Sequence, residues 1–260
     1  MSKTEKHPVR IVGAGPGDPE LITVKGRRAL EQAELVVYAG SLVPEAVLAW
    51  AGKQVRLENS AKMHLDQIVD LMVRAHAAGQ KVVRLHSGDP SLYGAIAEQI
   101  RALEQQNVPC EVIPGVTAAF AAAAKLQIEY TLPEICQTLI FTRMEGRTPV
   151  PEEENLADLA AHQASMAIYL SSGMADRLQA LLTDSYGENA PVAVVFKVSH
   201  QDEKILWTQA GSLAQTMKAE GITRQALVIA GRALGAQKAG HAASRLYDRG
   251  FTHGYRQGHE

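Results

Sequence analysis

Short apolar segments alternate with amphipathic segments through the first 115 residues of this 260-residue chain. The expected strands are Val9–Val12, Leu35–Ala39, Val55–Leu57, Val82–Leu85 and Glu111–Ile113. Between them lie segments whose apolar residues have helical spacing, of which Met63–Ala78 is the longest that ends at a glycine. A strand, helix, strand order brings successive strands into one sheet in parallel. The sequence therefore predicts a mainly parallel α/β domain over residues 1–115.

Residues 116–234 predict a second α/β domain with a mixed sheet. Val192–Val198 and Lys204–Thr208 flank a polar segment, which is typical of an antiparallel hairpin. Ala226–Ala230 is a further expected strand, because it is continuously apolar and short. Residues 235–260 have scattered Gly, His and Arg without a strong period, which favours a mobile tail.

Composition excludes several classes of function. The formal net charge of −2 and the 5% aromatic content argue against a nucleic-acid surface. Its apolar segments stay far below the roughly 18 residues of a membrane span, and the first residues lack an apolar leader. No His, Cys, Asp or Glu residues cluster at metal-ligand spacing. We therefore expect a cytoplasmic protein that binds no nucleic acid, no membrane and no metal.

Three glycine loops follow expected strands, namely Gly13–Pro19, His86–Gly94 and Pro114–Ala119. The carboxyl ends of parallel strands share one edge of a sheet, which is where α/β proteins bind ligands. A dinucleotide fingerprint would need glycine where Asp18 stands, so the first loop does not predict NAD binding. Neither a phosphate-binding P-loop nor a hydrolase elbow is present. The loops predict a small-molecule site built mostly of backbone.

Asp89 and His86 in the second loop each allow two interpretations. Asp89 is suited to be the N-cap of a helix expected over Pro90–Gln106, and its carboxylate is also suited to line a pocket. His86 is either a base or a histidine whose hydrogen bonds are satisfied at a strand end.

The glycine loops resemble those of the tetrapyrrole (corrin/porphyrin) methyltransferases, which use S-adenosylmethionine. The similarity lies in residues 13–23 (GAGPGDPELIT), 88–94 (GDPSLYG) and 114–117 (PGVT). The matching segments occur in the same order as in the family, and the resemblance extends over about residues 9–234.

Three further segments are similar to the branch of this family that methylates C-11 of precorrin-4 in cobalamin biosynthesis. They are residues 38–43 (YAGSLV), residues 142–151 (TRMEGRTPVP) and the tail residues 244–248 (SRLYD).

The resemblance implies two α/β domains with the active-site cleft between them, a homodimer, and a precorrin-4 type substrate. It implies cofactor contacts from Pro16, Ser87, Gly88, Asp89, Leu92, Tyr93, Val116, Thr117, Ala118, Leu170, Ala226 and Leu227. Asp89 and His86 are the candidates for a catalytic base. Candidate cations for the substrate carboxylates are Arg143, Arg147, Lys62, His64 and Lys197, since guanidinium groups bind carboxylates bidentately.

Other functions remain open at this point. One is a sibling methyltransferase that acts at C-20 or C-17, or on uroporphyrinogen III. Another is a diphthine-type synthase, which methylates a protein residue. A third is a cofactor-binding regulator without catalysis. The sequence does not distinguish a cobalt-containing from a metal-free macrocycle.

Overall fold

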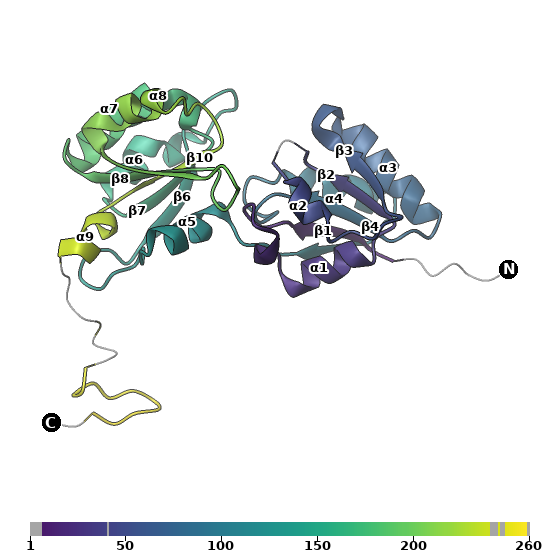
Figure 1. Cartoon of the computed structure of the whole chain (residues 1–260), viewed down its shortest axis with the longest axis horizontal. Helices are drawn as coiled ribbons and strands as arrows, with labels where there is room; N and C mark the ends of the chain where they lie inside the picture. Colours follow the sequence, from purple (N-terminus) through teal and green to yellow (C-terminus); the bar gives the residue numbers. More distant parts are fainter. Residues whose placement is uncertain (1–6, 41, 240–243, 245–247, 259–260) are drawn as a thin grey trace. The chain divides into compact units, whose positions relative to one another are not determined.

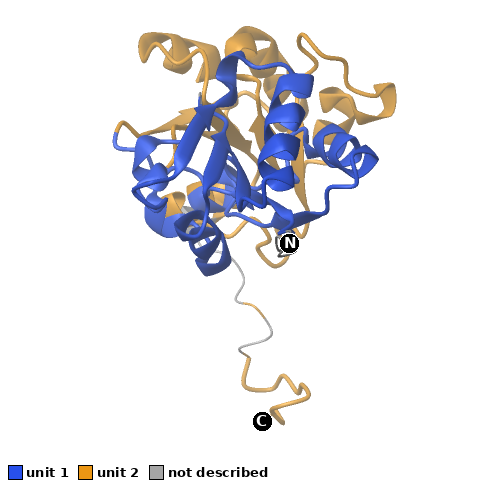
Figure 2. Cartoon of the chain, turned by 90° about the vertical axis from the view of Figure 1, so that its right-hand side faces the viewer, with its two compact units in different colours: residues 1–121, 199–201 blue, residues 122–198, 202–260 orange. Residues whose placement is uncertain are grey.

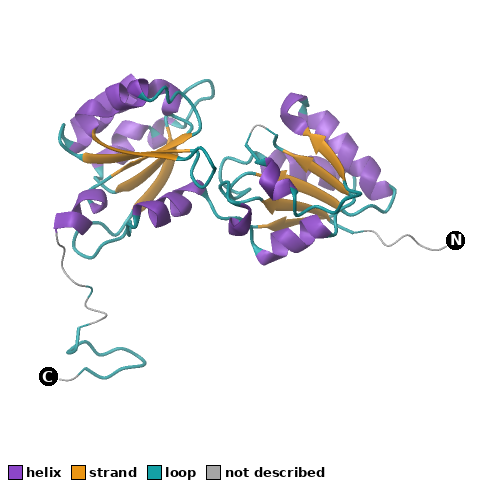
Figure 3. Ribbon diagram, viewed as in Figure 1, coloured by secondary structure: helices purple, strands orange, loops and turns teal. Residues whose placement is uncertain are grey.

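The computed structural model describes residues 7–40, 42–239, 244 and 248–258, and it divides the chain into two units (Figure 2). The first unit ends at Ala121 and also includes Ser199–Gln201. The second contains Ala122–Val198 and the chain from Asp202 onward. Each unit has one five-stranded sheet with helices packed on it (Figure 3), which confirms the expected α/β class.

The first unit is built on a parallel sheet, as the alternation in the sequence predicts (Figure 1). Its strands are β1 (Val9–Gly13), β2 (Leu35–Tyr38), β3 (Arg56–Asn59), β4 (Val82–His86) and β5 (Cys110–Ile113). Their order across the sheet is β3-β2-β4-β1-β5, and every neighbouring pair is parallel. β1 therefore lies between β4 and β5, so the three glycine loops leave adjacent strands.

Four helices cover the two faces of this sheet. They are α1 (Val24–Glu31), α2 (Glu45–Leu48), α3 (Leu65–Ala77) and α4 (Ile96–Gln105). Leu30 of α1 packs in one buried cluster with Leu85, whereas Leu103 of α4 packs in another cluster with Val37. The connections after β1 and β4 therefore leave toward opposite faces. This makes the boundary between β1 and β4 a topological switch point, the place in such sheets where ligands bind.

The helix expected over Pro90–Gln106 begins six residues later, at Ile96, and its N-cap is Ala95. The expectation that Asp89 caps this helix is therefore wrong. Tyr93 and Ala95 have φ of 57° and 48°, values that a right-handed helix does not contain. Gly94 allows the tight turn between them, because a Cβ there would lie 2.1 Å from the carbonyl oxygen of Pro90.

The second unit contains the mixed sheet that the hairpin predicts. Its strands are β6 (Leu139–Arg143), β7 (Ser165–Tyr169), β8 (Pro191–Phe196), β9 (Lys204–Gln209) and β10 (Ala226–Ala230). The order is β6-β7-β10-β8-β9, in which only β6 and β7 form a parallel pair. Consequently the carboxyl ends of β6, β7 and β8 and the amino end of β10 lie at one edge of this sheet.

The helices of this half are α5 (Ala118–Leu126), α6 (Leu156–Ala161), α7 (Ala175–Tyr186), α8 (Leu213–Ala219) and α9 (Ala233–Ala239). Leu156, Leu182 and Met217 bring α6, α7 and α8 into one buried cluster with β7, β8 and β10. The backbone of α9 extends through residues 235–239, where the sequence shows no strong period.

Parts of two sequence motifs lie outside the described residues, namely Ser41 of YAGSLV and Arg245, Leu246 and Tyr247 of SRLYD. None of the helices in the described part of the chain has the length and apolar character needed to cross a bilayer.

Candidate functional site

The loops after β1 and β4 are joined to each other by a two-residue antiparallel bridge. The Gly88 amide donates to the carbonyl oxygen of Gly15 at 2.7 Å, and the Gly15 amide donates to that of Gly88 at 3.3 Å. One residue earlier, the Ala14 amide donates to the carbonyl oxygen of His86 at 2.7 Å. The first and second glycine loops are therefore fixed in one arrangement at the switch point.

Crowding explains the glycines of the first and third loops. A Cβ on Gly13 would lie 2.6 Å from the Cα of Gly115 and from the carbonyl oxygen of Gly88. A Cβ on Gly115 would lie 2.2 Å from the same Gly88 oxygen. Real Cβ atoms do not approach backbone so closely. The three loops meet here with no room for a side chain on either residue.

Gly88 differs from these two glycines, because an added Cβ there would make only ordinary van der Waals contacts. Its φ is +61°, and the nearest atoms to an added Cβ are Thr117 Cα at 3.9 Å and the Val116 oxygen at 4.0 Å. Packing within the protein therefore leaves room for a methyl group at this position. The left-handed φ of Gly88, next to a switch point, is suited to a loop whose main chain approaches a ligand closely.

The Asp89 carboxylate joins the second loop to the third. Its Oδ2 accepts from the Gly115 amide at 2.9 Å, and its Oδ1 accepts from the Ser91 amide at 2.8 Å and from the Ser91 hydroxyl. Burial acts to raise the pKa of Asp89, but the hydrogen bonds from Ser91 and Gly115 outweigh it and lower that pKa. Asp89 is thus ionised at neutral pH and is suited to holding the loops together. Its lowered pKa also makes it a weak proton acceptor.

His86 is a buried, neutral histidine directly before the second loop. Burial and the nearby positive charge of Arg84 lower its pKa to about 4. Its Nε2 is buried without a hydrogen-bond partner among the described residues. A group with so low a pKa is a poor general base at pH 7.

Arg84 is a buried cation that sequence reasoning did not identify. Its Nε donates to Gln99 Oε1 at 2.9 Å, and a guanidinium nitrogen donates to the Val37 oxygen at 3.1 Å. Gln99 in turn donates to the oxygen of Ala95, the N-cap of α4. An arginine on an apolar strand has no periodic signal that distinguishes it from a surface charge, since only its tertiary partners make burial tolerable.

The other expected cofactor residues of the first unit lie in or directly beside these loops. Pro16 is buried in the first loop, and Ser87 and Leu92 are half-buried in the second. Tyr93 is 43% exposed in left-handed backbone. In the third loop Thr117 is buried, whereas Val116 and Ala118 are half-buried. The structure therefore gathers the expected residues of this unit at one edge of its sheet.

The expected cofactor residues of the second unit lie at the edge formed by the ends of β7 and β8 and the start of β10. Leu170 directly follows β7, is 67% exposed and has a φ of 52°. Gln225 and Lys197 at the same edge also have positive φ, and the Lys197 amide donates to the Gln225 oxygen at 2.9 Å. Strained non-glycine residues cluster at functional sites.

Ala226 and Leu227, by contrast, have buried side chains within β10. Any ligand contact that they make is therefore through the backbone.

The candidate cations for substrate binding fall into two groups. Arg143 is occupied by its own loop, since its guanidinium donates to the oxygens of Met144, Thr148 and Pro149. Lys197 forms an ion pair with Asp202.

The remaining candidates, Arg147, Lys62 and His64, are exposed, and their side chains form no salt bridge within the described part of the chain. Of the two arginines, Arg147 is thus the one with a guanidinium available for a new partner.

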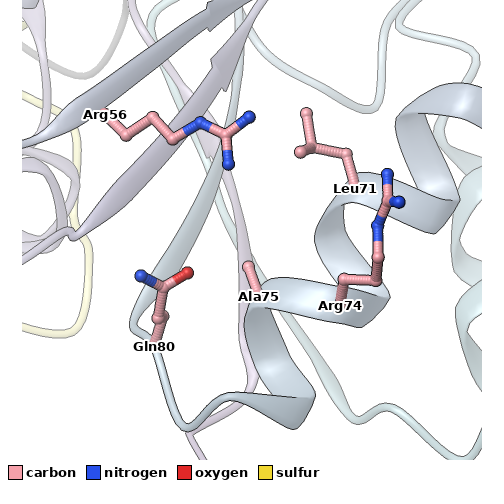
Figure 4. Close-up of a pocket in the computed structure, with 5 residues that line it drawn as sticks. All are labelled: Arg56, Leu71, Arg74, Ala75 and Gln80. Atoms are coloured by element: carbon pink, nitrogen blue, oxygen red, sulfur yellow. The ribbon is translucent and has the colours of Figure 1, made fainter.

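A separate hollow of about 410 Å³ lies near the opposite, amino edge of the first sheet (Figure 4). It is lined by Arg56, Leu71, Arg74, Ala75 and Gln80. Arg56 pairs with Glu58 and Arg74 pairs with Asp70, so both cations are already compensated. This hollow contains none of the expected site residues. Within the described residues, no group of three or more His, Cys, Asp or Glu side chains could hold a metal ion.

The left-handed Gly88 at the switch point predicts that an alanine there interferes with a ligand that approaches the backbone closely. Gly221 offers a matched control, because its φ is +66° and nothing lies within 4 Å of an added Cβ. Both Gly88→Ala and Gly221→Ala should lose about 1–2 kcal/mol of unfolding free energy, the cost of a left-handed alanine. Only Gly88→Ala should lower the affinity for S-adenosylhomocysteine, measured by calorimetry. If Gly88→Ala and Gly221→Ala bind S-adenosylhomocysteine with equal affinity, Gly88 serves only to form the turn.

The low pKa of His86 predicts acid destabilisation. Between its unfolded pKa of about 6.5 and its folded pKa of about 4, the unfolded chain binds the proton and the folded chain does not. Stability is therefore full above about pH 6.5 and falls as the pH drops toward 4.

From pH 7.5 to pH 5 this one group should remove about 2 kcal/mol from the unfolding free energy. His86→Phe, which leaves no polar atom unpaired, should remove that part of the pH dependence in urea titrations. An unchanged pH dependence in the variant would show that His86 titrates normally.

Known proteins of one family are similar to this chain. Residues 8–214 match the sequence model of the Tetrapyrrole (Corrin/Porphyrin) Methylases. A cobalt-precorrin-4 C(11)-methyltransferase of Methanocaldococcus jannaschii is 51% identical over 97% of both chains. A precorrin-4 C(11)-methyltransferase of Pseudomonas aeruginosa is 47% identical over 96% of this chain and 99% of its own.

Two solved structures are also similar. A cobalt precorrin-4 methyltransferase superposes with a TM-score of 0.85 at 45% identity, covering 87% of this chain and 95% of its own. A uroporphyrin-III C-methyl transferase from Thermus thermophilus, complexed with S-adenyl homocysteine, has a TM-score of 0.72 at 27% identity, covering 88% and 93%. The family match spans most of the chain, and the three glycine loops lie within it. The chain therefore belongs to the tetrapyrrole (corrin/porphyrin) methylases.

Proposed function

We propose that this protein is an S-adenosylmethionine-dependent methyltransferase that methylates C-11 of precorrin-4, or of its cobalt complex, in cobalamin biosynthesis. The observation that carries the proposal is the 51% identity, over 97% of both chains, to a cobalt-precorrin-4 C(11)-methyltransferase. The sibling enzyme that acts on uroporphyrin III is only 27% identical. The left-handed Gly88 at the switch point of the first sheet supports a small-molecule cofactor.

The two edges described above are suited to different parts of the cofactor. We assign its methionine end to the glycine loops of the first unit, which contain Gly88, Val116 and Thr117 and follow the strands at the switch point. The adenosyl part is assigned to the edge of the second unit that carries the exposed Leu170. When bound, S-adenosylmethionine supplies a methyl group on an already positive sulfur.

Catalysis in this proposal depends on alignment and charge. The bridge between Gly15 and Gly88 and the clamp from Asp89 to Gly115 hold the loops before any ligand arrives. Preorganised alignment of two reactants is worth up to about 7–11 kcal/mol of barrier. The ionised Asp89 and the carbonyl oxygens of the loops also place negative potential beside a positive ligand.

Arg147 and Lys62 are the proposed contacts for the substrate carboxylates, because both are exposed cations without a salt bridge in the described structure. Arg143 is assigned a different part, which is to hold the loop that presents Arg147, through its three bonds to loop carbonyls. A homodimer and a cytoplasmic location, both expected from the sequence, stay predictions.

The direct test is to incubate the purified protein with S-adenosylmethionine and either precorrin-4 or cobalt-precorrin-4. We expect one added methyl group by mass spectrometry, located at C-11 by NMR. Methylation at C-17 or C-20, or of uroporphyrinogen III, would assign the chain to a sibling activity. Tight cofactor binding without transfer to any macrocycle would indicate a regulator instead.

Arg147→Ala should raise the KM for the macrocycle about tenfold, the lower end for a lost charge-assisted hydrogen bond. The affinity for S-adenosylhomocysteine should stay unchanged, and added salt should reduce the difference from wild type. Arg28→Ala is the charge-matched control, because Arg28 is exposed near the end of α1. A loss of cofactor affinity with an unchanged KM for the macrocycle would move Arg147 to the cofactor side.

A further inference from the structure

β7 is an interior strand of the second sheet. It ends at Tyr169, although the next residue, Leu170, would still have a residue to pair with on the neighbouring strand. β7 lies between β6 and β10, and Ile168 pairs with Val228 in the antiparallel register. Continuing that register by two residues would place Leu170 opposite Ala226. Instead Leu170 turns into left-handed backbone with a φ of 52°. Because Leu170 leaves the sheet, the buried backbone beside it on the β6 side and on the β10 side loses the partner that a strand residue would have provided.

Ser172 replaces that partner on the β10 side. Its hydroxyl donates to the carbonyl oxygen of Ala226 at 2.9 Å and accepts from the Ala226 amide at 3.3 Å. Both Ala226 and Ser172 are buried. An unsatisfied amide or carbonyl in such a place is costly. One side chain therefore satisfies the two groups that a strand residue would have paired.

The hydroxyl of Ser171 provides a partner for the backbone on the β6 side. Its hydroxyl accepts from the amide of Met144, directly after β6, at 2.9 Å, and donates to the oxygen of Tyr169 at 2.7 Å. Ser171 has no exposed surface and Met144 is 5% exposed. Where β7 ends early, the two serines together provide partners for the backbone of Ala226 and Met144.

The residue released by this arrangement is Leu170, which is 67% exposed. A large apolar side chain gains nothing from exposure to water, and left-handed backbone is unfavourable for leucine. Such a conformation persists only where surrounding bonds impose it, and it marks binding surfaces. The two serines provide those bonds, Ser171 toward Met144 after β6 and Ser172 toward Ala226 of β10.

We infer that Ser171 and Ser172 are positioning residues that hold Leu170 out of the sheet as an apolar contact for the adenosyl part of the cofactor. The inference rests on the proposed function. Neither serine contacts the ligand in this account. They affect binding only by holding Leu170 in place. Replacing a serine should therefore weaken binding only while the leucine side chain is present.

The test is a double-mutant cycle read by calorimetry with S-adenosylhomocysteine. Ser172→Ala should weaken binding about tenfold, as expected when Leu170 is no longer held. Leu170→Gly should weaken it by a similar factor. Adding Ser172→Ala to Leu170→Gly should then change the affinity less than twofold.

Ser165→Ala is the matched control. Ser165 lies at the other end of β7, is 1% exposed, and donates to the Tyr130 oxygen at 2.7 Å. It should lose stability in urea as Ser172→Ala does, but keep wild-type affinity. Ser172→Thr, which retains a hydroxyl, should recover part of the affinity. If Ser172→Ala does not fold, Ser171→Ala takes its place in the cycle.

Equal effects of Ser172→Ala with and without Leu170 would overturn the inference, and so would normal binding by Leu170→Gly. A wild-type protein that does not bind S-adenosylhomocysteine at all would instead contradict the proposed function. The two failures are therefore distinguishable.

Discussion

The antiparallel bridge between Gly15 and Gly88 is the interaction on which the candidate site depends. It links the ends of β1 and β4, whose connections leave toward opposite faces of the sheet. Together with the bond from the Ala14 amide to the His86 oxygen, it holds these two loops together at the switch point. Asp89 adds the third loop through the Gly115 amide, and the contacts at Gly13 and Gly115 leave no space for side chains. A backbone surface is thereby fixed in place.

The second unit solves a related problem by other means. An interior strand must end before its neighbours so that Leu170 can face outward, and buried backbone would then lack partners. Two consecutive serine hydroxyls fill this role, one toward Met144 and one toward Ala226. In one unit glycine allows main chains to approach, and in the other serine replaces a main chain. Both devices build a ligand surface from backbone geometry.

The sequence predicted the α/β class, the parallel and mixed sheets and the three loops, because these depend on local apolar patterns and glycine positions. It failed where tertiary contacts decide. Asp89 precedes a proline and has the pattern of an N-cap, yet Gly115 and Ser91 use its carboxylate. Leu170 continues an apolar strand in the sequence, but the serines after it redirect the chain. Arg84 looks like any charged residue until Gln99 and Val37 are seen to bind it.

We expect the three loops to be locked together before any ligand binds. Amide hydrogen exchange by NMR on the ligand-free protein tests it directly at Gly88 and Gly115, whose amides bond to Gly15 and Asp89. The account predicts strong protection at both amides, comparable with that of the adjoining strands β1 and β4. Exchange as fast as that of an exposed loop amide would contradict it, since the loops would then order only on binding.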